Sequence, residues 1–327
     1  MPDSKPRVFI TRTIPEKALK MIAAACEVIV WDAETPPPRP KLLDELALAD
    51  GVVSMLTEKI DREALDAAPK LRIISNYAVG YDNVDIEAAS ERDIPVGNTP
   101  GVLTETTADQ AFMLLLAAAR RLPESIKYVK EGQWQTWFPL QMLGQEVSGA
   151  TLGIIGLGRI GYAMTKRAKG FGMKFLYHGG STIEYVERSG AKKVDLETLL
   201  TQSDFISIHA PLNDDTRGMI GAEELKLMKN TAILINTARG GVIQTDALLH
   251  ALKNNIIASA ALDVTDPEPL PSDHPLLALD NCIVVPHLGS ATHQTRERMG
   301  EIAAENLLLG LRGEHLTHCV NPQVYQN

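Results

Sequence analysis

The chain has 327 residues, of which 45% are hydrophobic and 22% charged, and this balance suits a globular protein of two domains. Its formal net charge is −9 and Lys and Arg form no cluster, which argues against a nucleic-acid-binding surface. Cys26, Cys282 and Cys319 are too few for a disulfide scaffold and lack the spacing of a zinc site. We therefore predict free thiols, no metal and a cytoplasmic location. The apolar stretch 111–119 is too short to span a membrane and indicates a buried helix.

Short β-branched segments alternate with helical patterns in the first hundred residues. The segments predicted as strands are 7–10, 27–30, 51–54 and 71–75. Such alternation is typical of parallel strands joined by crossover helices. The proline-rich stretch 34–40 is predicted to be a loop between two of these repeats.

A long helix and a second alternating series follow. The helix is predicted from Thr104, a suitable N-cap, to about Arg121. Strands are then expected in "TLGIIG", "KFLY", "FISIHA", "AILIN", "ASAALDV" and "CIVVPH", and a last helix over 292–311.

These elements predict an α/β protein with two doubly wound parallel-sheet domains. A Rossmann cofactor domain, residues 102–288, is expected to be inserted into a discontinuous flavodoxin-like substrate domain. That second domain would consist of residues 1–101 and 289–327.

The sequence "TLGIIGLGRIG" places Gly156, Gly158 and Gly161 in a G-x-G-x-x-G arrangement between a strand and a helix. Gly156 would allow the tight turn, Gly158 the close approach of a pyrophosphate, and Gly161 the packing of helix on strand. The helix N-terminus would attract the anion. The alternative is a glycine-rich turn without a ligand, but the context favours dinucleotide binding.

The next strand, "KFLYHGG", ends at His178, Gly179 and Gly180 without an acidic residue. An acid there would bind the ribose hydroxyls of NAD and repel a 2′-phosphate. Its absence makes NADP acceptable, and His178, Ser181 and Arg159 offer hydrogen bonds or charge. We predict NADP as the preferred cofactor, with NAD possible; an exposed turn that serves either cofactor is the alternative.

Three chargeable residues each follow a predicted strand: Arg239, Glu268 and His287. In doubly wound sheets ligands bind beyond the carboxyl ends of the strands, so all three belong to the edge where a substrate would lie. The guanidinium of Arg239 can hold a carboxylate and polarise a neighbouring carbonyl. His287 can exchange a proton with the carbonyl oxygen, and Glu268 can orient the imidazole and favour its protonated form.

Each of these residues alone has a plainer interpretation. His287 could be an exposed surface residue, Glu268 could be a solvated loop residue, and Arg239 could bind only a cofactor phosphate. Their joint occurrence in a dinucleotide-binding fold favours a catalytic trio.

Several longer motifs resemble one known family. "GLGRIG", "HAPLNDDTRGMI", "INTARGG", "ALDVTDPEPLPSDHPL" and "VVPHLGSATHQTR" are closely similar to the D-2-hydroxyacid dehydrogenases, and within them to the glyoxylate/hydroxypyruvate reductases. The likeness extends over almost the whole chain. It implies an NAD(P)-dependent oxidoreductase in which Arg239, Glu268 and His287 are catalytic.

The resemblance also implies further site residues. Asp263 would hold the nicotinamide carboxamide, and the amides of Val79 and Gly80 would bind the substrate carboxylate. Leu56 would either face the substrate or belong to the core. Trp137 would reach the pocket of a partner subunit in a homodimer built on segment 104–149, or serve only as an interface anchor. The other residues implied to line the cofactor are Thr107, Arg159, Ile160, Ala210, Pro211 and Thr237.

We therefore predict reduction of small 2-oxo acids, glyoxylate or hydroxypyruvate, to D-2-hydroxy acids, with His287 as the acid/base. The alternatives within the family are a 2-ketogluconate reductase and a phosphite dehydrogenase. An alternative outside catalysis is a nucleotide-sensing corepressor.

Overall fold

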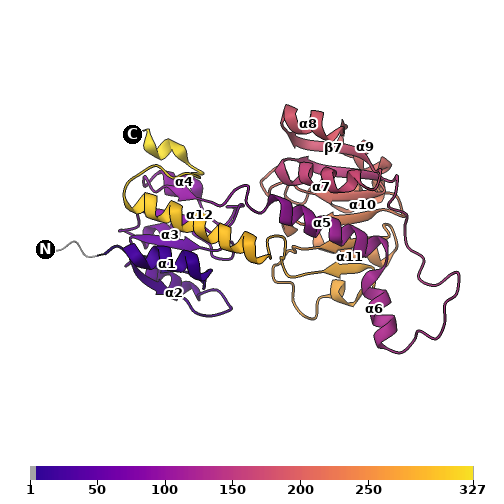
Figure 1. The fold of residues 1–327 in the computed structure, drawn as a ribbon, viewed down its shortest axis with the longest axis horizontal. Coiled ribbons are helices and arrows are strands. Elements are labelled where there is room, and N and C mark those ends of the chain that lie inside the picture. Colours follow the sequence, from indigo (N-terminus) through magenta and orange to yellow (C-terminus); the bar gives the residue numbers. More distant parts are fainter. Residues whose placement is uncertain (1–4, 327) are drawn as a thin grey trace. The chain divides into compact units, whose positions relative to one another are not determined.

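The computed structural model of the chain describes residues 5–326, apart from the side chain of Ser181. The chain forms two compact units (Figure 1). Unit 1 takes in the chain up to Leu103 and again from Ala291 onward, and unit 2 comprises Thr104–Ser290.

Unit 1 is built on a parallel sheet, five-stranded in the described part of the chain, with the order β2-β1-β3-β4-β5. This is the flavodoxin-like order, in which the direction of winding reverses between β1 and β3. The strand predicted at 71–75 begins two residues later than expected, because the amide of Leu71 donates to the carbonyl of Ala68 and closes a turn there. The strands are β1 (Arg7–Ile10), β2 (Glu27–Val30), β3 (Gly51–Ser54), β4 (Ile73–Asn76) and β5 (Val96–Gly97).

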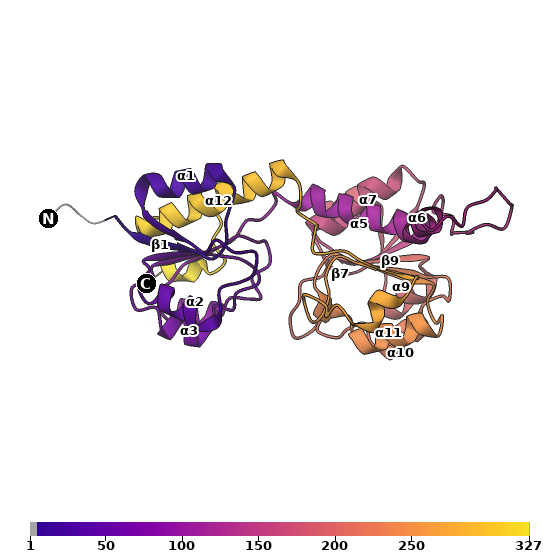
Figure 2. The same ribbon diagram turned by 90° about the horizontal axis from the view of Figure 1, so that it is seen from below.

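Helices cover both faces of this sheet (Figure 2). One face carries α1 (Glu16–Ala25) and α12 (His293–Leu311), whose first turn is capped by the side chain of Thr292. The other face carries α2 (Arg39–Leu46), α3 (Arg62–Asp66) and α4 (Ile86–Ser90). The proline-rich loop is shorter than predicted, since α2 already begins at Arg39 and accommodates Pro40 in its first turn, where proline has no amide bond to lose.

Unit 2 contains a parallel sheet that has seven strands among the described residues, in the order β12-β11-β10-β9-β6-β7-β8. Its central part is the Rossmann order, which reverses between β6 and β9. The strands are β6 (Thr151–Leu157), β7 (Lys174–Ser181), β8 (Lys192–Lys193), β9 (Phe205–Ile208), β10 (Ile233–Asn236), β11 (Ser259–Leu262) and β12 (Cys282–Val284).

Two apolar layers sandwich this second sheet (Figure 2). The long predicted helix ends at Ala119, because Arg121 takes a left-handed conformation (φ 51°) that separates α5 from α6. The helices on one side are α5 (Thr104–Ala119) and α7 (Arg159–Lys169), and on the other α9 (Leu196–Gln202), α10 (Ala222–Leu227) and α11 (Thr245–Lys253). Unit 2 also contains α6 (Leu122–Lys130), α8 (Ile183–Ser189) and short 3-10 turns at Gly240–Val242 and Pro275–Ala278. A further 3-10 turn, Pro322–Tyr325, belongs to unit 1.

The predicted fold class is confirmed: two doubly wound parallel sheets, each with helices on both faces. Among residues 5–326, no helix combines the length and the apolar character needed to cross a membrane.

Candidate active site

The three candidate catalytic residues follow neighbouring strands of unit 2. Arg239 lies three residues after the end of β10, Glu268 lies in the loop after β11, and His287 lies three residues after the end of β12. Because β12, β11 and β10 are adjacent and parallel, their loops leave the same edge of the sheet. The order of strands in space thus brings together residues that are far apart in the sequence.

Glu268 and His287 are in direct contact. His287 Nδ1 lies 2.6 Å from Glu268 Oε1, so Nδ1 carries a proton and donates it to the carboxylate, while Nε2 makes no hydrogen bond to the described residues. The second carboxylate oxygen, Oε2, accepts the backbone amide of Thr265 at 3.3 Å. The two side chains are 26% and 34% exposed, which leaves them accessible to a small molecule while water is partly excluded.

Asp263 holds the turn that presents His287. Its carboxylate is buried and accepts the amides of Leu288 (2.7 Å) and Gly289 (2.8 Å), while its carbonyl accepts the amide of His287 (2.9 Å). Gln110 on α5 donates to the same carboxylate at 3.2 Å. His287 itself is left-handed (φ 54°), a conformation that non-glycine residues adopt only when their surroundings enforce it. Asp263 therefore positions the imidazole.

The turn that carries Arg239 is fixed by Asn236, the fully buried last residue of β10. Its side chain donates to the carbonyl of Arg239 (2.8 Å) and accepts the amide of Ala238 (3.0 Å). At Gly240 a Cβ would lie 2.0 Å from the Thr265 carbonyl, so only glycine allows the Arg239 turn to pack against the loop of Glu268.

The phosphate-binding turn has the geometry that its glycines predict. Gly156 is left-handed (φ 92°), and a Cβ on it would meet the backbone of His209 and Ala210 at 2.8 Å. A Cβ on Gly161 would lie 2.4 Å from the Gly156 carbonyl. A Cβ on Gly158, in contrast, would meet nothing within 4 Å, so the space above this residue at the start of α7 is open.

One buried hydroxyl on the same edge of the sheet has no partner in the described structure. Thr237 follows β10, is buried, and its Oγ1 makes no hydrogen bond to the described residues. A buried polar atom without a partner is costly unless a ligand supplies one. Thr107, also buried, donates to the carbonyl of Gly289 at 3.1 Å and so supports the His287 turn.

A second histidine lies on this edge. His209 directly follows β9, its amide donates to Ile155 O (2.7 Å), and its Nε2 lies 2.9 Å from Ser207 Oγ. Desolvation of the ring lowers the pKa of His209 to about 4. A histidine that stays neutral at physiological pH can donate a hydrogen bond, but it holds no extra proton to transfer.

The end of β7 is irregular, with Gly179 (φ 69°) and Gly180 (φ 42°) both left-handed. His178 Nδ1 lies 3.2 Å from Val194 O, so the ring is directed toward the protein. Arg159 is exposed at the first turn of α7. The side chain of Ser181 lies outside the described residues.

In unit 1, Val79 and Gly80 follow β4 at the carboxyl edge of its sheet. Asn98 donates to the carbonyl of Val79 (2.9 Å) and Asn76 to that of Gly80 (2.8 Å). The amides of these two residues donate to no other residue in the described structure. Their N–H groups are thus available to an anion.

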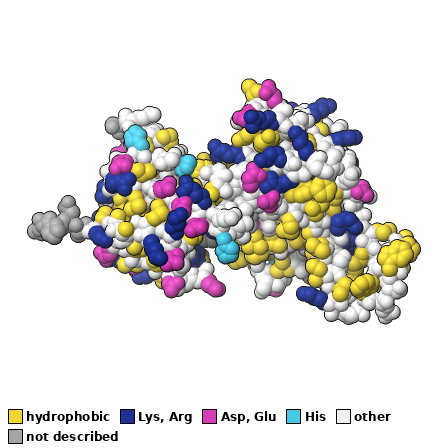
Figure 3. Space-filling view, in the orientation of Figure 1, with side chains coloured by type: hydrophobic (Ala, Val, Ile, Leu, Met, Phe, Trp, Pro, Cys, Tyr) yellow, Lys and Arg dark blue, Asp and Glu magenta, His cyan; other side chains and the backbone are white. Residues whose placement is uncertain are grey.

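Hydrophobic side chains are exposed on α6 and the loop after it (Figure 3). Trp137 is 76% exposed and contacts none of the other candidate site residues of unit 2 by a hydrogen bond or ring contact among those described. The exposed apolar residues here are Leu122, Ile126, Val129, Trp134, Trp137, Phe138, Leu140 and Leu143.

The family follows from comparison with known proteins. The family model described as "D-isomer specific 2-hydroxyacid dehydrogenase, NAD binding domain" matches residues 112–289, which lie in unit 2. The chain belongs to this family. The dehydrogenase is 52% identical over 322 residues to a glyoxylate reductase of Korarchaeum cryptofilum, covering 98% of this chain and 97% of the relative. It is also 52% identical over 325 residues to a glyoxylate reductase of Thermococcus litoralis, with 98% of each chain covered.

Solved structures agree with this assignment. An NADPH-dependent glyoxylate/hydroxypyruvate reductase from Sinorhizobium meliloti, in complex with NADP and malonate, superposes on the dehydrogenase with a TM-score of 0.86. The two are 31% identical, and 98% of each chain is covered. The predicted family and the presence of a Rossmann NAD-binding domain are confirmed.

Sequence reasoning missed several residues that shape the site of the dehydrogenase. Gln110 and Asn236 act through hydrogen bonds to other site residues. Asn236 lies within the motif "INTARGG" but was given no role, and Gln110 lies in none of the quoted motifs. His209 did carry a signal, since it follows a predicted strand as His287 does.

Proposed function

We propose that the dehydrogenase reduces small 2-oxo acids, glyoxylate and hydroxypyruvate, to the corresponding D-2-hydroxy acids. The observation that carries this proposal is the 2.6 Å contact between His287 Nδ1 and Glu268, on the same sheet edge as the glycine turn of β6. An imidazole whose far nitrogen is held by a carboxylate is suited to proton transfer at its free nitrogen.

In this proposal His287 acts as the acid. Its Nε2 gives a proton to the carbonyl oxygen of the substrate, and the carboxylate of Glu268 stabilises the protonated ring before transfer. Asp263 and Thr107 keep the turn of His287 in place through Gly289. A bound nicotinamide dinucleotide supplies the hydride. In the reverse direction the same nitrogen takes the proton from the hydroxyl group.

Arg239 binds and polarises the substrate. Its planar guanidinium can hold a carboxylate with two parallel hydrogen bonds and place positive charge near the oxygen that becomes negative. In unit 1, the N–H groups of Val79 and Gly80 are proposed to bind the substrate carboxylate, and Asn98 and Asn76 hold the carbonyls of these two residues in place. Leu56, half-buried in unit 1, is proposed to face the substrate side chain.

The residues of unit 2 fit a dinucleotide. The open space above Gly158 suits a pyrophosphate at the N-terminus of α7, and the unpartnered hydroxyl of Thr237 suits a polar atom of the cofactor. The other residues proposed to line it are Thr107, Gly156, Arg159, Ile160, Gly161, His178, Gly179, Gly180, Ser181, Ala210, Pro211 and Asp263. We propose NADP as the preferred cofactor, because β7 ends at His178, Gly179 and Gly180 without an acid that would repel a 2′-phosphate.

Unit 2 is accordingly proposed as the dinucleotide-binding domain and unit 1 as the substrate-binding domain. The exposed apolar side chains of α6 and the following loop support a homodimer formed through segment 104–149, with Trp137 contacting the partner. A cytoplasmic location remains a prediction from the sequence.

A substrate panel tests the proposed function. We expect the purified chain to oxidise NADPH faster than NADH with glyoxylate and hydroxypyruvate. The reaction is monitored by the loss of the absorbance of the reduced nicotinamide. Turnover confined to 2-ketogluconate, or reduction of NAD by phosphite, would assign the dehydrogenase to one of the alternative activities. Cofactor binding without turnover on any of these compounds would favour a sensor.

A further inference from the structure

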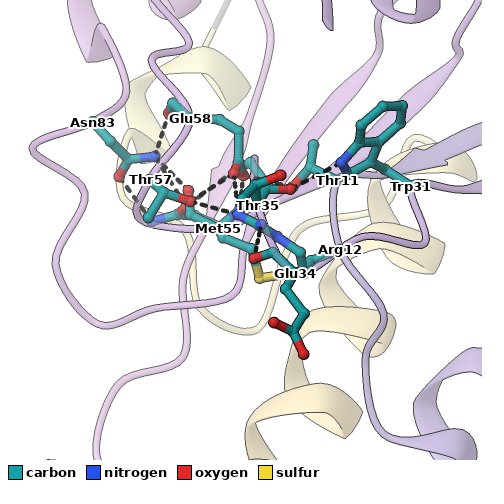
Figure 4. Close-up of polar contacts among 11 residues, drawn as sticks. Thr11, Arg12, Trp31, Glu34, Thr35, Met55, Thr57, Glu58 and Asn83 are labelled. Carbon is teal, nitrogen blue, oxygen red and sulfur yellow. Dashed lines mark hydrogen bonds and ion pairs between the residues drawn. The ribbon is translucent and has the colours of Figure 1, made fainter. Parts of the chain in front are cut away.

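A buried carboxylate organises the carboxyl edge of the unit 1 sheet (Figure 4). The side chain of Glu58 is 1% exposed, although it lies in the loop just after β3. Its charge is compensated by Arg12, which follows β1 and whose Nη2 lies 3.0 Å from Glu58 Oε1. Loops after two adjacent strands are thus joined at one buried ion pair.

Both oxygens of Glu58 are saturated with hydrogen bonds. Oε2 accepts the hydroxyl of Thr11 (2.5 Å) and the backbone amide of Met55 (2.7 Å). Oε1 accepts the hydroxyl of Thr57 (2.6 Å) and the guanidinium of Arg12. Arg12 also donates to Thr57 Oγ1 (3.0 Å). The carboxylate of Glu58 thus contacts the start of the turn 55–58 through the amide of Met55 and its end through the hydroxyl of Thr57.

Asn83 holds the same turn from the other side. Its amide nitrogen donates to the carbonyls of Met55 (2.9 Å) and Glu58 (3.0 Å). It also lies 3.3 Å from Asn76, whose own amide donates to the carbonyl of Gly80. One hydrogen-bonded network therefore connects the turn 55–58 with the loop of the proposed substrate carboxylate site.

The buried ion pair of Glu58 and Arg12 is better explained by the geometry that it fixes than by the stability that it adds. A buried ion pair gains little over well-packed apolar side chains, because desolvation opposes its Coulomb attraction. What it provides is a fixed geometry, since each oxygen accepts only donors in defined directions. The main chain fixed in this way carries Met55 and Leu56, both half-buried at the edge of the sheet where ligands of doubly wound folds bind.

We propose that Glu58 is a positioning residue that sets the substrate selectivity of the dehydrogenase by fixing the turn 55–58. This inference rests on the proposed reduction of 2-oxo acids. Glu58 touches no reacting atom; it acts through the main chain at Met55 and Leu56. If the turn 55–58 is less rigid, binding should weaken most for the substrate whose side chain contacts this turn. Hydroxypyruvate carries a hydroxymethyl group that glyoxylate lacks, so it is the more sensitive probe.

The test is the variant Glu58→Gln, whose amide has the size of the carboxylate but offers one acceptor oxygen in place of two. We expect KM for hydroxypyruvate to rise about tenfold and KM for glyoxylate to rise less, with kcat and the Kd of NADPH close to wild type. The matched control is Glu91→Gln, which removes the charge of an exposed glutamate paired with Arg62 in the same unit. Its kinetic constants should equal those of wild type.

A second variant, Asn83→Ala, tests the same turn without changing its charge, and it decides the matter if Glu58→Gln does not fold. We expect it to shift the ratio of the two KM values in the same direction. A lower Tm with an unchanged KM ratio in the variants that fold would show a merely structural role and overturn the inference. Wild-type protein that reduces neither acid would overturn the proposed function instead, and with it this inference.

Discussion

Replacing His287 with alanine is expected to lower kcat for glyoxylate reduction by about two powers of ten or more, since general acid catalysis contributes roughly that much. Alanine cannot deliver a proton to the carbonyl oxygen. A water molecule in place of the imidazole would not be oriented for proton transfer as Glu268 orients the ring. The Kd of NADPH, measured by fluorescence titration, should stay near the wild-type value, because the glycine turn after β6 is untouched.

The control for this variant is His250→Ala. His250 is an exposed histidine on α11 of the same unit, and its ring contacts only Asn254 among the hydrogen bonds described. Its loss should leave kcat unchanged. Wild-type kcat in the His287→Ala protein would remove this residue from the mechanism.

Replacing Arg239 with lysine is expected to lower kcat/KM for glyoxylate by about two powers of ten, most of it through a higher KM. Lysine keeps the positive charge but cannot form two parallel hydrogen bonds to a carboxylate. The variant therefore separates the geometry of the guanidinium from its charge. Steady-state kinetics over a wide range of glyoxylate concentrations resolve the two constants.

Arg188→Lys is the matched control, because Arg188 is an exposed arginine of α8 that pairs with Glu184 on the surface. It should behave as wild type. If Arg239→Lys retained the wild-type kcat/KM, the substrate carboxylate would not be held by Arg239, and another cation would have to be sought.

The fold could be predicted because its signal is local and repeated. Most of the longer strands are apolar runs, and β-branched runs such as 205–208 and 233–236 lie at the expected sequence distances from helical patterns. The elements that were missed are those without such a signal. The two-residue strands β5 and β8 have no period of their own, and the break at Arg121 depends on a single left-handed residue.

The candidate site could be predicted only in part, for a related reason. Residues that follow strands are recognisable in the sequence, so Arg239, Glu268 and His287 could be predicted as candidates from it. Residues that position them depend on contacts across long sequence separations. Asp263 accepts a hydrogen bond from Gln110, which lies 153 positions earlier in the sequence. Thr107 donates to the carbonyl of Gly289, which lies 182 positions later. The resemblance marks Asp263 and Thr107 as cofactor residues, but their contacts with the turn of His287 become visible only when the fold buries them.

The central claim is that Glu268 acts through His287, and a double-variant cycle measures this most directly. The kcat for glyoxylate is determined for wild type, Glu268→Gln, His287→Ala and the protein carrying both changes. Coupled residues are strongly non-additive, so we predict that Glu268→Gln slows the wild type but slows the His287→Ala protein no further. The same fold reduction in both backgrounds would show that Glu268 works independently of the imidazole and would contradict the account.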